Sequence, residues 1–290
     1  MKMCCRLSSI ILVLGIFIFL SSTAFCASIG DVETNGKGKF AVGVDEEFIF
    51  YRGMQGKAFT LGETVNTVAY SGTVYLQPKI EWMDRLLIKA SYGMLDFMDV
   101  FIKFGESSSK TKVVVNGPMT WAGGGPTWAN AVAKYKCGPT PVYAGGIRVA
   151  VPVPEFKDLL IGCDVQYMAQ YGGYDGEVVG EYHGGGQDGS FVRKWNNRML
   201  IQEWHAAPYI AVKIEKLVPY TSFIPYVGIK YSDFCEFSAD YFGGKENYYA
   251  DTNIGLFTGI NVKICDNITL NCEGRFFDET ALSFGGAVKF

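Results

Sequence analysis

Apolar and polar residues alternate, position by position, through most of the chain after residue 38. Between residues 250 and 264, the even positions include Ile254, Leu256 and Ile260, whereas the odd positions hold small or polar residues such as Gly259. A repeat of two is the side-chain period of a β-strand, because successive side chains point to opposite faces of a sheet. The pattern recurs in about ten segments, and it therefore predicts an all-β fold.

The residue types on the two faces indicate which kind of β fold forms. A soluble sandwich also alternates, with apolar side chains inward and polar ones outward. Here the polar face carries many glycines and charges of both signs, and the apolar face carries Trp, Tyr and Phe near the strand ends. This arrangement is typical of transmembrane barrels, whose apolar residues face lipid and whose small or polar residues face the lumen. We expect a closed antiparallel transmembrane β-barrel, since lipid excludes open sheet edges.

Short and long connections alternate between the expected strands. The short ones lie at 95–98, 152–157, 216–220 and 265–267, and the long, glycine-rich ones at 53–71, 108–141, 171–196 and 237–249. Outer-membrane barrels have short periplasmic turns and long extracellular loops, so both termini are expected in the periplasm. The ten predicted strands are roughly 38–51, 73–94, 98–108, 142–152, 158–170, 197–215, 221–236, 250–264, 267–277 and 280–290.

Two segments leave the expected strand number between eight and twelve. Residues 73–94 keep one apolar phase and, at about 3.3 Å per residue, exceed a membrane core of about 30 Å. Either this strand extends beyond the membrane, or Met83 and Asp84 close an additional hairpin. Residues 127–137 are the second candidate for an additional strand.

The first 26 residues have the features of a secretory signal peptide. Lys2 and Arg6 precede an apolar run from Ile10 to Leu20, and mostly small residues follow up to Cys26. The run is shorter than the roughly 20 residues of a spanning helix. An uncleaved anchor and a lipid on Cys26 remain alternatives. The chain is accordingly divided into a signal peptide (1–26), a periplasmic N-terminal segment (27–37) and an outer-membrane barrel (38–290).

Three stretches repeat a pattern of alternating strand and turn: SYGMLDFMDVFIKFG (91–105), VPYTSFIPYVGIKYSD (218–233) and DNITLNCEGRFFDETALSFGGAVKF (266–290). They resemble small bacterial outer-membrane β-barrel proteins, the OmpA-like and OmpW-like porin-family group. The last strand, with its aligned residues Leu282, Phe284, Val288 and Phe290, resembles the signal by which Gram-negative bacteria recognise barrels for assembly. The resemblance covers roughly residues 38–290. It implies a location in the outer membrane of a Gram-negative-type bacterium, with membrane lipid and the barrel-assembly machinery as partners.

Sequence motifs for catalysis and for metal binding are absent from the chain. The phosphate-loop pattern, H-E-x-x-H and G-x-S-x-G do not occur, and the five cysteines after residue 26 form no C-x-x-C pair. The net charge of −3, without a Lys/Arg stripe, argues against nucleic-acid binding. We therefore expect no enzyme activity, cofactor or metal. One alternative is a hydrolase at the lumen mouth that uses Glu203 and His205, since some ten-strand outer-membrane proteases carry an acid and a histidine there.

The polar face of the strands places many charged residues and one histidine in the predicted lumen. The bases are Lys39, Lys79, Arg85, Lys89, Lys103, Arg148, His205, Lys213, Lys230, Lys263, Arg275 and Lys289, and the acids are Asp45, Glu47, Glu81, Asp164, Glu203 and Glu273. Buried charges must be paired or hydrated, because desolvating them alone is expensive. We expect mutual pairing, and the alternative is a narrow passage that weakly favours anions. Barrels of about eight strands fill their interior with side chains, and ten strands lie near that limit.

Two functions are compatible with this sequence. The first is a structural or narrow, porin-like barrel that passes small solutes. The second is an adhesin-type barrel that binds an extracellular partner through the loops expected at 108–141 and 171–196. Aromatic residues anchor many protein interfaces, and those in or beside the two loops are Trp121, Trp128, Tyr174, Tyr182 and Trp195. Packing of the loops on one another would explain these aromatic residues equally well.

Overall fold

The chain folds into β-strands throughout the part that the structure describes. A computed structural model gives the positions of residues 30–65, 68–121, 126–183, 189–239, 245–264 and 267–290. The strands are β1 (Phe40–Gly53), β2 (Lys57–Val65), β3 (Val68–Leu95), β4 (Met98–Trp121), β5 (Pro126–Val153), β6 (Phe156–His183), β7 (Gly189–Val212), β8 (Ile214–Val218), β9 (Thr221–Ala239), β10 (Lys245–Tyr249), β11 (Ile254–Ile264), β12 (Ile268–Phe276) and β13 (Thr280–Lys289). Among these residues, no helix is long and apolar enough to cross a membrane.

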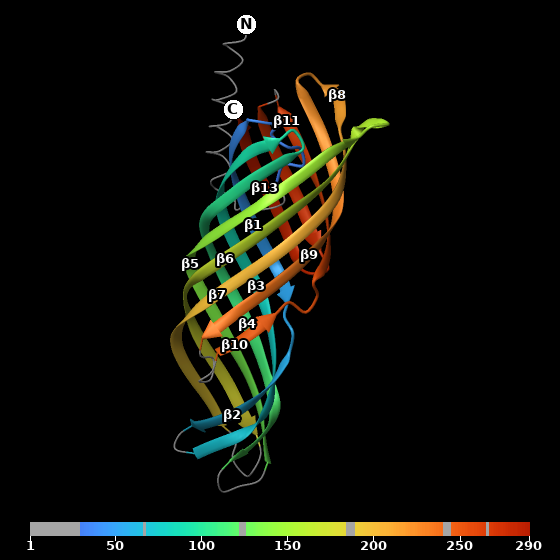
Figure 1. The fold of residues 1–290 in the computed structure, drawn as a ribbon. Helices are drawn as coiled ribbons and strands as arrows, with labels where there is room; N and C mark the ends of the chain where they lie inside the picture. Colours follow the sequence, from blue (N-terminus) through green and yellow to red (C-terminus); the bar gives the residue numbers. More distant parts are fainter. Residues whose placement is uncertain (1–29, 66–67, 122–125, 184–188, 240–244, 265–266) are drawn as a thin grey trace.

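Ten of the strands close into one antiparallel barrel (Figure 1). Their order around the ring is β1-β13-β12-β11-β9-β7-β6-β5-β4-β3, and β3 pairs back with β1. The first and last strands meet at a seam, where Ala41 lies opposite Lys289 and Phe48 lies opposite Leu282. β2 lies off this ring and pairs with β3, and β8 and β10 pair with β9. The expected closed antiparallel barrel of about ten strands is confirmed.

Five strands of the ring are longer than the sequence predicted, and three of them, β4, β5 and β6, are more than twice as long. β3 to β7 contain 24–28 residues each, whereas β11 to β13 contain 9–11. β3 runs through Met83 and Asp84 without a hairpin, and β5 includes residues 127–137. The loops expected at 108–141 and 171–196 are wrong, because β4 pairs with β5, and β6 with β7, along most of these stretches. Glycine and polar residues gave these stretches the composition of loops, but they also fit a strand whose outer face meets water.

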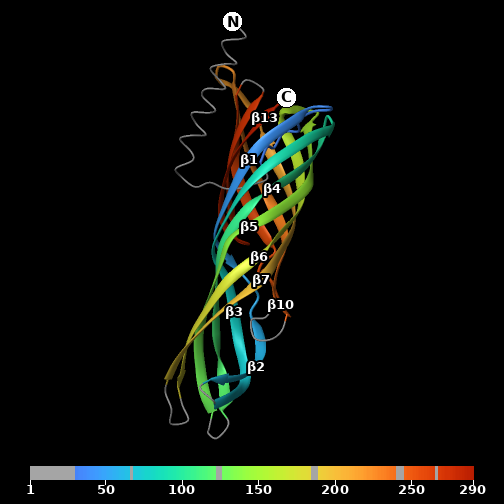
Figure 2. The same cartoon turned by 90° about the vertical axis from the view of Figure 1, so that its left-hand side faces the viewer.

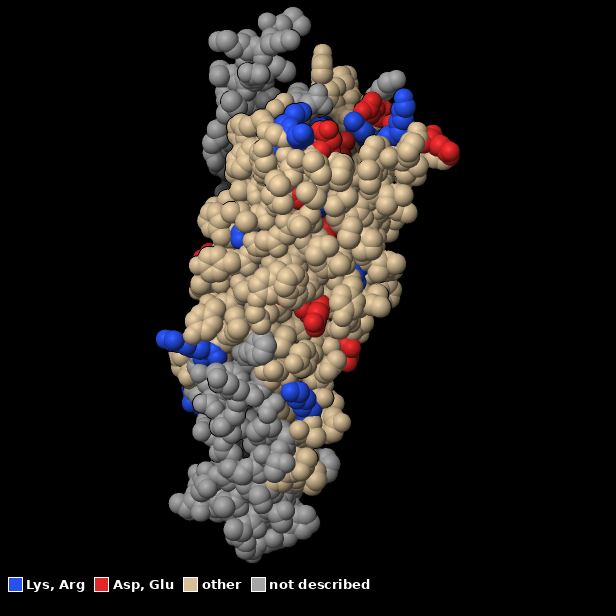
Figure 3. Space-filling view, in the orientation of Figure 1, with Lys and Arg blue, Asp and Glu red and all other residues tan. Residues whose placement is uncertain are grey.

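An apolar belt surrounds the barrel on its outer face. Its side chains are large and exposed, for example Ile102 (62% exposed), Tyr143 (64%) and Trp204 (55%). On the face that Figure 3 shows, this surface is a broad zone with few charged side chains, and Lys, Arg, Asp and Glu gather above it. A contiguous apolar surface of this extent marks a region that contacts lipid or another protein.

Strands β3 to β7 continue past the barrel on one side as a curved wall (Figure 2). We call this wall the distal extension and define it as β2 together with residues 68–81, 108–121, 126–139, 172–183 and 189–199. Its two faces are reversed relative to the barrel. Val113, Tyr135 and Tyr174 point inward and are at most 3% exposed, whereas Lys110 and Lys134 are exposed on the outer face.

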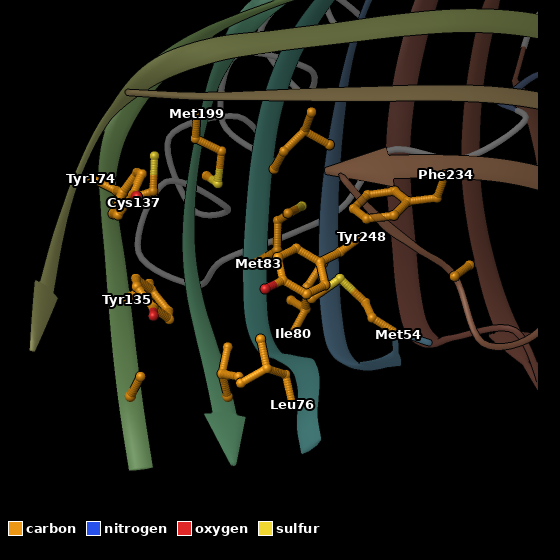
Figure 4. Packing of buried hydrophobic residues seen from close by; sticks show 14 of the residues in the cluster. Met54, Leu76, Ile80, Met83, Tyr135, Cys137, Tyr174, Met199, Phe234 and Tyr248 are labelled. Carbon is orange, nitrogen blue, oxygen red and sulfur yellow. The ribbon is translucent and has the colours of Figure 1, made fainter. Parts of the chain in front are cut away.

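The inward residues of the distal extension belong to the largest apolar cluster in the described part of the protein. Figure 4 shows this cluster where the extension joins the barrel, with Ile80 and Met83 of β3 close to Phe234 of β9, Tyr248 of β10 and Met54. An apolar interior with a charged exterior is the distribution that a protein adopts in water. The barrel and its extension are therefore built for two different surroundings.

Bulges change which residues face the lumen. In β3 the bulge lies between Ile80 and Trp82, and in β1 it lies between Ile49 and Tyr51. A bulge adds one residue to a strand and so shifts its alternation by one position. As a result, Arg52 turns into the lumen, although its even position in β1 predicts the outer face. This side chain is fully buried.

Glycines on the lumen face make room for aromatic rings that point inward. The Tyr209 ring of β7 lies against Gly162 of β6, and the Tyr226 ring of β9 lies against Gly259 of β11. A β-carbon at either glycine would overlap the neighbouring ring. These glycines therefore contribute to a filled interior and do not widen a channel.

Candidate functional site: the filled lumen

The lumen of the barrel is lined by charged side chains that are almost completely buried. Eleven of the charged residues expected there are at most 6% exposed: Asp45, Glu47, Arg85, Lys89, Lys103, Arg148, Asp164, Glu203, Lys230, Glu273 and Arg275. The partly exposed residues His205, Lys213, Lys263 and Lys289 point into the same interior. Alternation alone thus places most of the lumen charges.

Three residues expected in the lumen lie elsewhere. Lys79 and Glu81 face outward on the distal extension, where their side chains are 37% and 40% exposed and pair at 3.6 Å. The bulge in β3 separates them from Arg85, which keeps its inward position, and this break in alternation explains the error. Lys39 directly precedes β1 and is exposed.

Arg52 is the centre of one group of lumen charges, which we call the Arg52 cluster. Its members are Glu47, Arg52, Arg85, Glu203, Lys230, Glu273, Arg275, Asp278 and Glu279. The Arg52 guanidinium lies 3.0 Å from Glu203 and 3.1 Å from Glu279. It also donates to the Ser232 hydroxyl at 2.6 Å and covers the Phe234 ring, 4.3 Å from the centroid. One side chain thus connects β1 to β7, to β9 and to the turn before β13.

Lys230 and Arg275 complete the pairing of acids in this cluster. The Lys230 ammonium lies 2.7 Å from Glu279, 3.2 Å from Glu203 and 3.5 Å from Asp278. Arg275 lies 2.8 Å from Glu279 and also pairs with Glu47, which in turn pairs with Arg85. The cluster holds four cations and five acids, all buried. Buried charges at this density stabilise one another only while the pairing stays complete.

A second group of charges, the Asp164 cluster, comprises Asp45, Lys89, Lys103, Arg148, Asp164 and His205. Lys103 lies 3.0 Å from Asp45, and Arg148 lies 3.0 Å from Asp164. The ammonium groups of Lys89 and Lys103 and the guanidinium of Arg148 lie 5.0, 5.5 and 5.7 Å from the centre of the Phe101 ring. The negative face of an aromatic ring attracts cations at such distances, so Phe101 helps to keep three like charges together.

The arrangement of Glu203 and His205 does not resemble a catalytic pair. Glu203 is engaged by Arg52, Lys230 and the Ser232 hydroxyl, which donates to it at 2.7 Å. His205 instead faces Asp164, with its Nε2 atom 3.5 Å from the carboxylate. A general base needs its acceptor atoms free to reach a proton on substrate or water. The geometry favours a role for both residues in holding the lumen together.

Residues 30–38, which we call the N-terminal segment, occupy the lumen at the end where both termini of the barrel lie. Val32 is fully buried in an apolar group with Tyr209 and Phe257, and the Tyr209 hydroxyl donates to the Val32 carbonyl at 2.9 Å. The Asn35 amide donates to the Asp99 carboxylate at 2.9 Å. The segment expected in the periplasm thus packs inside the barrel, because its apolar and polar side chains find partners there.

Ion pairs and hydrogen bonds also connect the N-terminal segment to β11 and β13. Lys263 of β11 lies 2.8 Å from Glu33, and Lys289 of β13 donates to the Thr34 carbonyl at 3.2 Å. Asn261 donates to the Asp31 carboxylate at 3.2 Å. The segment is therefore held by β11 and β13 as well as by Asp99 of β4.

The lumen is full and nearly neutral in the part of the chain that the structure describes. The fully buried charges are seven cations and eight acids. Two cavities lined by these side chains have volumes of about 20 Å³ each. A cavity of this size holds about one water molecule. Sequence reasoning missed Arg52, Asp278 and Glu279. A bulge turns Arg52 inward. Asp278 and Glu279 lie in the turn between the short strands β12 and β13, and the longer strands of the barrel extend past this turn.

The predicted loop aromatics lie in strands. Tyr174 is buried on the inner face of the distal extension, where its ring meets that of Tyr135 edge to face at 5.6 Å. Its assignment to an exposed loop is wrong, since apolar residues point inward in this part of the protein. The other four belong to β4, β5, β6 and β7, and their side chains lie outside the described part: Trp121, Trp128, Tyr182 and Trp195.

The last strand of the barrel carries the proposed assembly signal on its outer face. Leu282 is 42% exposed and Phe290 is 71% exposed. Val288 lies opposite Val42 of β1, and Phe284 lies opposite Glu46 of β1. The Phe290 amide donates to the Phe40 carbonyl at 2.8 Å, so the C-terminal residue takes part in the seam.

No protein-family model matches this sequence, and no curated protein matches it. Among solved structures, the outer-membrane protease OmpT of Escherichia coli is similar over 86% of this chain and 94% of its own, with 10% identity and a TM-score of 0.40. OprG of Pseudomonas aeruginosa matches 90% of this chain and 99% of its own, with 11% identity and a TM-score of 0.29. Ail of Yersinia pestis matches 88% and 99%, with 9% identity and a TM-score of 0.23. At these scores the similarities bear on neither activity nor partner, and the closed barrel rests on its own strand pairing.

Proposed function

We propose that this chain is an outer-membrane β-barrel with a closed lumen, which anchors the distal extension and presents it outside the cell as a binding surface. The observation that carries this proposal is the filled interior. The Arg52 cluster, the Asp164 cluster and the N-terminal segment occupy the lumen in turn, and the two cavities that lumen side chains line have volumes of only about 20 Å³ each. A narrow passage for solutes would require the side chains of both clusters to leave their partners.

The width of the apolar belt supports insertion into a membrane. On β6, outward apolar side chains run from Ile161 to Tyr171, both about half exposed. Ten residues correspond to about 33 Å along a strand, or about 23 Å of height at a tilt of 45°. The apolar band of outer-membrane barrels is about 25 Å tall. The outer membrane of a Gram-negative-type bacterium is therefore the proposed location.

The barrel-assembly machinery is the first proposed partner. Leu282 on the outer face of β13 and Phe290 directly after this strand are exposed, and a second protein can reach them before the seam with β1 closes. The second proposed partner is extracellular and binds the distal extension. In place of flexible loops, this region offers paired strands over an apolar core, and such a surface loses little conformational entropy on binding.

Conductance across a planar bilayer tests the closed lumen. We expect the folded protein, purified from membranes and inserted into the bilayer, to give no stepwise current at voltages where a known porin conducts. Discrete and reproducible current steps from the wild-type chain would overturn the proposal.

A matched variant distinguishes closure of the lumen by the N-terminal segment from closure by the two charge clusters. Val32→Asp/Glu33→Lys places a charge among Tyr209 and Phe257 and sets a lysine beside Lys263, so it should expel the N-terminal segment. Silence of this variant would assign the seal to the two charge clusters. Current steps in the variant alone would assign it to the N-terminal segment.

A further inference from the structure

Four lysines face one another on the outer side of the distal extension. Lys110 of β4 lies directly opposite Lys136 of β5, and Lys112 lies opposite Lys134. Side chains opposite one another in antiparallel strands have β-carbons about 4.5–5.5 Å apart, and like charges there are destabilising. Two such pairs at successive positions on the same face of the sheet point to a ligand that offsets the repulsion.

Three of these lysines border a hollow of about 580 Å³ on this face. Lys110, Lys134 and Lys136 line it together with Lys194 of β7, and the acids Glu81, Asp175 and Glu177 lie among them. Its volume falls in the range of about 300–1,000 Å³ that is typical of pockets for small ligands. The hollow thus offers space next to a concentration of positive charge.

Two of the three acids beside the hollow form ion pairs, and one of them pairs with Lys112. Glu81 pairs with Lys79 at 3.6 Å and with Lys112 at 3.9 Å, and Glu177 pairs with Lys194 at 3.3 Å. Asp175, which lies opposite Lys136 in β6, accepts a hydrogen bond from Asn196 at 3.0 Å.

Among the described residues, three of the four lysines form no close ion pair, although Lys134 lies opposite Glu177 and Lys136 lies opposite Asp175 in β6. Within the described part of the chain, no ion pair of 4.0 Å or less involves Lys110, Lys134 or Lys136. Only Asp175 among the acids of the hollow has no ion pair there, so the local balance is positive.

The lysine group lies beyond the edge of the apolar belt. On β4, Lys110 follows the outward Phe104 by six residues, which is about 20 Å along a strand and about 14 Å of height at a tilt of 45°. The Lys110 ammonium lies 5.6 Å from the centre of the Trp82 ring. A group at this height meets the headgroup side of a membrane that covers the belt.

We infer that Lys110, Lys112, Lys134 and Lys136 bind the phosphate groups of phosphorylated glycolipids in the outer leaflet around the barrel. This inference rests on the proposed location in the outer membrane, whose outer leaflet carries such lipids. Lysine is a common ligand of phosphate, and basic residues near an anionic membrane surface each add to its binding. The apolar belt holds the acyl chains, so the headgroup of a bound lipid reaches the lysines without leaving the bilayer.

Binding of a labelled diphosphorylated lipid A to the barrel in phosphatidylcholine vesicles tests this site. Lys110→Gln/Lys136→Gln removes both lysines of one pair, and we expect about 30-fold weaker binding than wild type. The matched control Lys37→Gln/Lys157→Gln removes two exposed lysines at the end of the barrel that lies away from the distal extension. This control should bind lipid A like wild type. Dephosphorylated lipid A should bind the wild-type protein no better than it binds the variant.

Each other outcome has a defined meaning. Equal affinities of the wild-type protein and the Lys110→Gln/Lys136→Gln variant overturn the inference. Competition by inorganic pyrophosphate as strong as that by lipid A, at equal concentration, would assign the site to a soluble phosphate and overturn the glycolipid assignment. If the wild-type chain does not insert into vesicles, judged by its altered gel migration before boiling, the proposed location fails and the inference fails with it. Insertion without lipid preference refutes the site alone.

Discussion

Replacement of Arg52 is the most direct test of how the lumen is held together. We predict that Arg52→Met lowers the free energy of unfolding by about 3–5 kcal/mol, the cost of leaving a buried charge without its partner. Arg52 is fully buried and makes ion pairs of 3.0 and 3.1 Å, and its loss leaves three cations against five acids in the Arg52 cluster. Methionine keeps much of the volume beside Phe234, so the loss is chiefly one of charge.

Denaturant titration of the barrel in phospholipid vesicles measures this effect, with tryptophan fluorescence and gel migration before boiling as independent readouts. The double variant Arg52→Met/Glu279→Gln removes one acid as well and should recover most of the lost stability, because replacing both partners of a buried pair is often nearly neutral. Lys194→Met is the exposed control. It breaks a pair with side chains 76% and 45% exposed, so it should cost less than about 1 kcal/mol. The reasoning is refuted if Arg52→Met costs no more than Lys194→Met, or if the double variant is as unstable as the single one.

Four further perturbations test the two faces, the packing and the termini. Ile102→Lys puts a charge on the outer face of β4 and should cost about 2–4 kcal/mol in vesicles; an unchanged denaturation midpoint would contradict the lipid contact. Gly162→Leu should cost about 1–3 kcal/mol by overlap with the Tyr209 ring, measured in the same titration, and a stable variant would argue against a tightly filled lumen. Phe290→Ala should lower the amount of barrel in outer-membrane fractions on immunoblots far more than the same change at the exposed Phe277, and equal levels would count against the assembly signal. A cysteine replacing Val32 should resist a water-soluble maleimide until the barrel unfolds, while one replacing the exposed Lys37 reacts at once; fast labelling at both positions would remove the N-terminal segment from the lumen.

Alternation in the sequence was sufficient to predict the strands of the ring, but it could not show where the faces reverse. In β3, Ile80 and Leu86 both occupy even positions and both are apolar, yet Ile80 is fully buried and Leu86 is 43% exposed. The pattern along the sequence is continuous because two changes cancel. The bulge near Glu81 shifts the alternation by one residue, and the surroundings change at the same level from the apolar belt to the water-facing extension. Regular alternation of apolar residues therefore predicts a strand, but it does not predict which side chains face the interior and which face outward.

The lumen charges show the same limit. Lys103 and Asp164 lie within regular alternation, and their inward positions follow from it. Arg52 faces the lumen because of a bulge that the residue types of β1 do not indicate. Glu279 lies in a turn that is buried because strands far away in the sequence extend past it. The N-terminal segment lacks alternation altogether, and its place beside Tyr209 follows from the partners it finds in the folded barrel. Positions set by local periodicity were predictable, whereas those set by long-range packing were not.

The seam between β1 and β13 has a consequence for how the barrel folds. Most other neighbouring strands of the ring are joined by short stretches of chain, so their hairpins can form early, and the longer connections from β1 to β3 and from β9 to β11 are still local in the sequence. The seam must wait until the two ends of the chain meet. Residues 30–38 are attached directly to β1, so they travel with the strand that closes the ring. Formation of the last strand pair and entry of the N-terminal segment are therefore coupled in time. A folding intermediate with an open seam would also lack the N-terminal segment in its lumen. It would be the species most exposed to proteases and to strand exchange with a second chain.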